Sequence, residues 1–186
     1  MRLVPRLSKW IGALIFTASL LALTPTSAHA QNKPGTFDVT PFLGIGFGSD
    51  LDGASTLLGV AGGYNYTENL SFEGELAIIP DIAGGNANID TPVFTLSGNG
   101  VYHFNTGTKV VPYATLGIGI GHTKVTVHDT PSLDTSETGF QVNLGGGAKA
   151  DVTDKLAVRG DLRYFHTNDQ PAYWRLYGGV VFKFPR

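Results

Sequence analysis

The stretch Leu156-Ala-Val-Arg-Gly-Asp-Leu-Arg-Tyr164 alternates between apolar and charged side chains. One parity holds Leu156, Val158, Leu162 and Tyr164, and the other holds Arg159, Asp161 and Arg163. Successive side chains of a β-strand point to opposite faces of a sheet, so a period of two is typical of a strand with one apolar and one polar face. The stretch therefore predicts such a strand, and the same period recurs from Thr36 onward.

Eight segments of the chain have this period. They are Thr36–Gly48, Ala54–Tyr66, Leu70–Pro80, Pro92–Phe104, Val110–Thr123, Thr138–Asp151, Leu156–Thr167 and Ala172–Phe184. The links between the segments alternate in character. Short polar turns are expected at Thr67–Asn69, Asn105–Lys109 and Val152–Lys155. The other links are generally longer loops, at Ser49–Gly53, Asp81–Thr91 and Lys124–Glu137, and the last of them, Asn168–Pro171, is short. Tilted membrane strands need about 9–11 residues, and short turns opposite longer loops are typical of an outer-membrane barrel whose turns face the periplasm.

The first thirty residues have the order of a secretory signal peptide. A basic start precedes the apolar run Trp10–Leu23, and Ala28-His29-Ala30 places small residues at alternate positions. An uncleaved helical anchor is the alternative, but the run is shorter than the roughly 20 residues of a spanning helix, and Pro25 interrupts the stretch after it. We therefore expect cleavage after Ala30. Removal of residues 1–30 would leave residues 31–186 as one β-barrel domain.

Composition excludes several classes of partner and site. Residues 31–186 carry ten Lys and Arg against fifteen Asp and Glu, so no basic stripe is left to neutralise nucleic-acid phosphates. The chain has no cysteine, which excludes disulfides and thiolate metal sites. Charged residues make up 15% of the chain, against about 25% in typical globular proteins. After residue 30 no apolar run has the length of a membrane helix, so strands would have to provide any membrane span.

The polar faces of the segments indicate which side of the barrel meets lipid. A soluble, lipocalin-like barrel would turn its apolar face inward and its polar face to water. The polar faces here are rich in glycine, including Gly44, Gly46, Gly117, Gly119, Gly121, Gly145 and Gly147. A water-exposed face favours long charged side chains, whereas small residues fit the inside of a narrow barrel. The sequence therefore predicts an all-β protein, an eight-stranded antiparallel up-and-down transmembrane β-barrel.

Ten charged residues lie on these polar faces, in equal numbers of each sign. They are Asp38, Glu73, Glu75, Asp151 and Asp161, with Lys149, Arg159, Arg163, Arg175 and Lys183. Inward charges are tolerated only when they are paired and hydrogen bonded. We expect a lumen charge network that bridges strands, with a blocked or very narrow lumen, because eight strands enclose about enough room for their own side chains. Scattered surface charge is the alternative interpretation.

Aromatic residues gather near the turn-side ends of the apolar faces. They are Phe37, Tyr64, Tyr66, Phe72, Tyr102, Phe104, Phe182 and Phe184. Such a distribution is typical of the aromatic girdle at the membrane interface, and ordinary core packing is the alternative.

Several of these segments resemble the outer-membrane β-barrel domain family, which is related to the eight-stranded domain of OmpA and grouped with small porin-family proteins. The resemblance rests on Val111–Gly121, Val142–Lys149 and Val152–Tyr164. It implies a location in the outer membrane of a Gram-negative-type envelope, contact with outer-membrane lipid and lipopolysaccharide, and a monomer. The closing segment Tyr177–Phe184 resembles the C-terminal strand that such proteins present to the barrel-assembly machinery, which implies an insertion signal at Tyr177, Phe182 and Phe184.

The sequence contains no complete catalytic or metal-binding set. His166-Thr167-Asn168-Asp169 faintly resembles the His-x-Ser-Asn motif of lipid A deacylases, but Asn168 stands in place of the serine nucleophile. Thr167 is no substitute, because adjacent strand residues point to opposite faces. His122 and His128 flank the start of the longest loop, without the further ligands that a metal site needs.

We therefore expect a protein that is not an enzyme and has no cofactor or metal. Its expected role is structural or in surface interaction, with a filled lumen. The alternatives are a narrow channel for small solutes and, after it, a lipid A-modifying enzyme.

Overall fold

The structure, a computed structural model, describes residues 32–48, 54–80, 89–90, 92–127, 135–168 and 170–184. The predicted signal peptide lies outside them. The described residues form nine strands: β1 (Phe37–Phe47), β2 (Ser55–Asn65), β3 (Leu70–Ile79), β4 (Ile89–Asp90), β5 (Val93–His103), β6 (Val110–Val127), β7 (Thr135–Asp151), β8 (Leu156–Thr167) and β9 (Gln170–Phe184). Among the described residues, no helix has the length and apolar character needed to cross a membrane.

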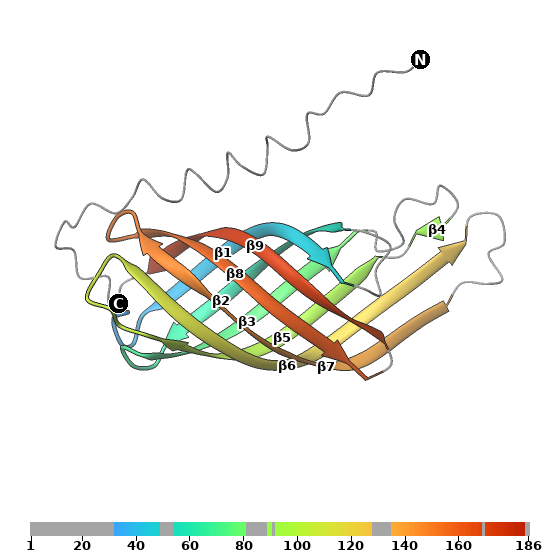
Figure 1. Ribbon diagram of the computed structural model, residues 1–186, viewed down its shortest axis with the longest axis horizontal. Helices are drawn as coiled ribbons and strands as arrows, with labels where there is room; N and C mark the ends of the chain where they lie inside the picture. The colour runs from blue at the N-terminus through green and yellow to red at the C-terminus, as the bar shows by residue number, and fades with distance from the viewer. Residues whose placement is uncertain are drawn as a thin grey trace, which may run out of the picture.

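All strands except β4 form a closed antiparallel barrel of eight strands, as predicted (Figure 1). Each pairs with its neighbours along the chain, and β9 pairs with β1 to close the ring. Following directly paired residues once around the barrel leads from Phe37 through Tyr64, Phe72, Gly100, Leu116, Leu144, Tyr164 and Trp174 back to β1 at Phe47. This return point is ten residues further along β1, a stagger that tilts the strands by about 40° to the barrel axis.

The hairpin of β6 and β7 is longer than the sequence predicts. The expected loop Lys124–Glu137 is wrong at both ends, because Lys124 pairs with Ser136 and Val125 with Thr135. The two residues of β4 pair with Thr126 and Val127, so a three-stranded extension projects beyond the barrel rim (Figure 1). Side chains of the extension at Lys124, Ser136, Glu137 and Thr138 are exposed on both faces, which removes the alternation that identifies a strand.

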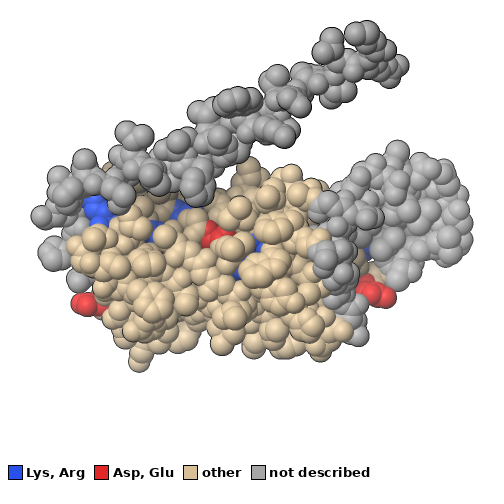
Figure 2. All heavy atoms as spheres, in the orientation of Figure 1, with Lys and Arg blue, Asp and Glu red and all other residues tan. Residues whose placement is uncertain are grey.

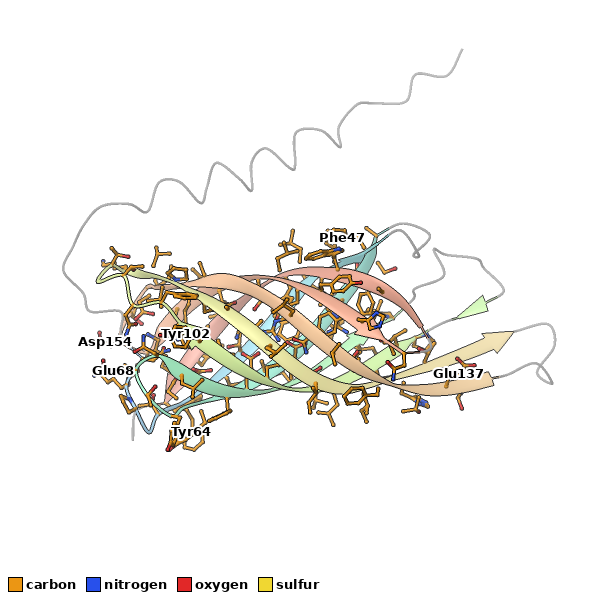
Figure 3. The ribbon with its side chains drawn as sticks, turned by 60° about the horizontal axis from the view of Figure 1, so that its bottom comes forward. Phe47, Tyr64, Glu68, Tyr102, Glu137 and Asp154 are labelled. Carbon is orange, nitrogen blue, oxygen red and sulfur yellow. The ribbon has the colours of Figure 1, made fainter. Side chains whose placement is uncertain are left out.

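The outward faces of the eight strands form an apolar belt. Leu43, Leu116 and Leu144 are each more than 60% exposed, and the described flank carries only small patches of charge (Figure 2). The predicted girdle residues also point outward: all are exposed except Tyr64, which is half-buried. Figure 3 places Tyr64 and Tyr102 near the end of the barrel that carries Glu68 and Asp154 of the short turns. An apolar surface of this extent is unsuited to water, so the interpretation as a soluble barrel and the core-packing interpretation of these aromatic residues are wrong.

Candidate functional site in the barrel lumen

Six charged side chains meet in the middle of the lumen and form a single cluster. We call Glu73, Glu75, Arg159, Asp161, Arg163 and Arg175 the ion cluster. The acids of β3 face the bases of β8 across the barrel, because β3 and β8 are four strands apart in the ring of eight. Every member is at most 9% exposed. Glycine makes room for the cluster: a Cβ at Gly145 would lie 2.7 Å from both Cα and Cγ of Arg163.

Arg163 is the centre of the ion cluster. Its guanidinium contacts Glu73 Oε1 at 2.8 Å through Nη2, Glu75 Oε2 at 3.1 Å through Nη1 and Asp161 Oδ1 at 2.9 Å through Nε. Arg159 pairs with Glu73 and, at 2.8 Å, with Asp161 Oδ2. Arg175 pairs with Glu75 Oε1 at 3.2 Å. The six side chains therefore form a continuous bridge across the lumen.

Tyrosine hydroxyl groups add hydrogen bonds to the cluster. Tyr113 donates to Asp161 Oδ2 at 2.6 Å and accepts from Arg159 Nε at 2.7 Å. Tyr177 donates to Glu75 Oε2 at 3.0 Å, and Tyr173 accepts from Arg175 Nη2 at 2.6 Å. Each of these tyrosines is about 95% buried. Charged groups that are paired and hydrogen bonded in this way can be held away from water.

The other four predicted lumen charges lie on the turn side of the ion cluster. Lys183 pairs with Asp151 at 2.5 Å, and both are partly exposed. Asp38 accepts a hydrogen bond from Asn65 Nδ2 at 3.3 Å, and Lys149 donates to Asn32 Oδ1. All four residues line a polar vestibule of about 230 Å³ at this end of the barrel. The structure thus brings six of the ten charges into one cluster and leaves four near the mouth.

An apolar layer lies on the loop side of the ion cluster. It consists of Leu57, Ile79, Val93, Phe165 and Tyr173, which are all buried. The guanidinium of Arg175 lies over the ring of Phe165, 4.0 Å from its centroid, so the layer packs directly on the cluster. Sequence reasoning missed this layer. The signal was available, because Phe165 has the same parity as Arg163, and Ile79 the same parity as Glu75.

The three residues of the implied insertion signal lie on different faces of β9. Phe182 and Phe184 point outward and are exposed near the turn-side end. Tyr177 points into the lumen, where it donates to Glu75 and stacks on Phe42 with 4.5 Å between ring centroids. Tyr177 therefore contacts the ion cluster and does not share the outward face that carries Phe182 and Phe184.

The histidines considered for chemistry do not assemble a site among the described residues. His166 faces outward and Thr167 is buried on the inward face, as their adjacent positions predict; Asp169 lies outside the described residues. His122 contacts Thr138 Oγ1 at 2.8 Å through Nδ1, and His128 lies outside the described residues. Within the described part of the chain, no three His, Asp or Glu residues are grouped as a metal site would require.

A closed eight-stranded barrel with an apolar belt outside and paired charges inside defines a small transmembrane barrel. The chain belongs to the outer membrane protein beta-barrel domain family, which it matches over residues 16–184. The protein is therefore an outer-membrane protein, as its sequence predicts.

Three solved structures share the fold. Neisserial surface protein A has a TM-score of 0.66 and 17% sequence identity, over 81% of this chain and 97% of that chain. The N-terminal β-barrel domain of Pseudomonas aeruginosa OprF has a TM-score of 0.60 and 19% identity, over 82% of this chain and 100% of that chain. Ail, the attachment invasion locus protein of Yersinia pestis, has a TM-score of 0.55 and 15% identity, over 81% of this chain and 99% of that chain. Outer membrane protein PagN of Salmonella typhimurium is 31% identical over 75 residues, which are 37% of this chain and 31% of PagN. The match thus spans about a third of the length of PagN.

Proposed function

We propose that this protein is a non-enzymatic barrel of a Gram-negative-type outer membrane, with a filled lumen and a structural and surface-interaction role. The ion cluster is the observation that carries the proposal, because its side chains cross the lumen between β3, β8 and β9. The apolar layer adds a second barrier on the loop side, where a hydrophobic constriction opposes the passage of water and ions. The lack of a serine nucleophile two residues after His166, where Asn168 stands, supports the absence of deacylase chemistry.

In planar lipid bilayers, we expect the purified protein to give no steady conductance steps. The physical reason is that an ion would have to displace both the paired guanidinium groups and the apolar layer. Single-channel recording over a range of voltages makes the measurement. Steady, ion-selective steps would instead establish the narrow channel for small solutes.

The loop side is the part of the molecule that supports a surface role. The extension of β4, β6 and β7 projects beyond the rim, and the four predicted loop segments contain eight Asp and Glu but one Lys. One structure of Ail is a complex with the heparin analogue sucrose octasulfate. The acidic loops of this chain favour a cationic partner surface over such a sulfated ligand.

Cells that display the protein should bind polylysine-coated beads several-fold better than heparin-coated beads, and added salt should weaken the binding. Replacing Asp129 and Asp134 with asparagine should reduce the binding to polylysine. Equal binding to both bead types, or no effect of the replacements, would contradict a charge-based surface role.

We further propose that outer-membrane lipid and lipopolysaccharide surround the apolar belt, that the barrel is a monomer without nucleic-acid partners, and that the barrel-assembly machinery inserts it. Phe182 and Phe184 would carry the insertion signal, since both are exposed on the outward face of the last strand.

The variant Phe184→Ala should lower the amount of folded barrel in the outer membrane several-fold, because an exposed terminal aromatic would be lost before insertion. The amount is measured by membrane fractionation and the mobility of unboiled samples in gels. Tyr66→Ala is the matched control, since Tyr66 is also an exposed turn-side aromatic, at 60%. An equal loss in both variants would assign the effect to the aromatic girdle and reject the signal.

A further inference from the structure

A small polar cavity lies in the turn-side half of the lumen. Its volume is about 20 Å³, and its lining includes Asp38, Thr40, His103 and Lys149. Asp38 and Lys149 also line the vestibule. They are the two predicted lumen charges that form no ion pair with any described residue, although they have opposite signs. The cavity therefore lies beside Asp38 and Lys149, the two predicted lumen charges without an ion pair among the described residues.

The hydrogen bonds around Ser71 determine which nitrogen of His103 carries the proton. Asn65 Nδ2 donates to Asp38 Oδ2 and lies 3.5 Å from the carbonyl oxygen of Thr36. Both of these oxygens can only accept hydrogen bonds, so the amide group of Asn65 must direct its nitrogen toward them and its oxygen toward Ser71. That oxygen accepts the hydroxyl proton of Ser71 at 2.7 Å. Ser71 Oγ, 3.1 Å from His103 Nε2, must then accept the N–H of the imidazole.

His103 Nδ1 is consequently a lone-pair acceptor in the neutral ring. Burial disfavours a positive charge on the imidazole, and the two acids that line the cavity, Asp38 and Glu73, are balanced there by the two bases Lys149 and Arg159. His103 is 5% exposed, and its Nδ1 has no hydrogen-bond partner among the described residues. Thr40 is 1% exposed, and its Oγ1 also lacks a partner there. Two residues that line one cavity therefore each carry a buried polar atom without a partner among the described residues, and His103 Nδ1 requires a ligand that donates a hydrogen bond.

We propose that this cavity is a binding site for a single water molecule, which donates to His103 Nδ1 and is held by Thr40 Oγ1. A volume of about 20 Å³ holds one water, and buried waters typically make about three hydrogen bonds. An anion cannot satisfy a nitrogen lone pair, and no three His, Asp or Glu side chains of the described residues are grouped as a metal cation would require. The water lies in the cavity that Asp38 and Lys149 also line.

Nuclear magnetic resonance of the folded, isotope-labelled protein in lipid nanodiscs tests the site. The expected spectrum has His103 neutral with the proton on Nε2, and shows magnetisation transfer from a long-lived water to the imidazole of His103. The variant Thr40→Val should weaken this transfer several-fold. Thr115→Val is the matched control, because Thr115 is 2% exposed and its hydroxyl also lacks a partner, yet it does not line the cavity.

Each alternative outcome counts against the site. A proton on Nδ1, or no water contact at His103 in the unaltered protein, overturns the proposal without any variant. The proposal also fails if Thr40→Val leaves the water signal unchanged, or if Thr115→Val reduces it equally. Displacement of the water signal by added sodium or chloride would identify an ion as the ligand and would reject water.

Discussion

Replacing Arg163 with methionine is expected to lower the free energy of unfolding of the barrel by about 3–5 kcal/mol. Methionine is apolar and leaves Glu73, Glu75 and Asp161 without the guanidinium that contacts all three. Each carboxylate keeps one other guanidinium, that of Arg159 or Arg175, but three buried acids then face two bases. Water cannot rehydrate the excess negative charge inside the barrel, so the folded state is destabilised. Urea titration of the protein in lipid vesicles, followed by gel mobility without boiling, gives the free energy.

The matched control for this prediction is Lys183→Met. Lys183 forms one ion pair, with Asp151, and both side chains are partly exposed near the turn-side mouth. Such pairs contribute about 1 kcal/mol or less, so the control should be nearly as stable as the unaltered protein. If Arg163→Met were as mild as Lys183→Met, the ion cluster would not be a buried network.

The variant Leu144→Arg is expected to destabilise the inserted barrel by about 2–4 kcal/mol. Leu144 is 61% exposed on the outward face of β7, near the middle of the apolar belt. An arginine there would meet acyl chains. Thr138 lies on the same face of the same strand, beyond the belt, so Thr138→Arg should cost about 0–1 kcal/mol. The same titration in vesicles compares the two variants.

A soluble barrel gives the opposite ranking for these two arginines. If the outward face met water, arginine at position 144 would be well solvated and as harmless as arginine at position 138. Equal stabilities of Leu144→Arg and Thr138→Arg would therefore contradict the membrane assignment.

The period of two allowed the barrel and the direction of most side chains to be predicted from the sequence. Parity places Glu73 and Arg163 on the polar faces of their strands, and the many glycines on those faces indicate that the faces point inward. Parity cannot show which charges pair, since Arg163 meets Glu73 and Glu75 only after the ring closes and the stagger of ten residues brings β3 opposite β8. The same limit applies to Asp38 and Lys149, which belong to the balanced set of charges but form no ion pair with any described residue.

Two other features were missed for separate physical reasons. The upper part of the hairpin of β6 and β7 lies outside the belt, where Lys124 and Ser136 are both exposed and no face must be apolar. The pattern therefore disappears although the strands continue. The apolar layer was missed because Phe165 and Ile79 break the expectation that inward residues are polar. Their burial depends on packing against residues far away in the sequence, such as Arg175 over Phe165.

The direction in which the apolar side chains face is best tested by spin labels placed one at a time along β8. The chain has no cysteine of its own, so a single introduced cysteine carries each label. Labels at Val158, Leu162 and Tyr164 should be more accessible to oxygen dissolved in the bilayer than to a water-soluble nickel chelate. A label at Lys155, in the exposed turn before β8, should show the reverse. Higher accessibility of Leu162 to the nickel chelate than to oxygen would contradict the account, because it would place the apolar face in water.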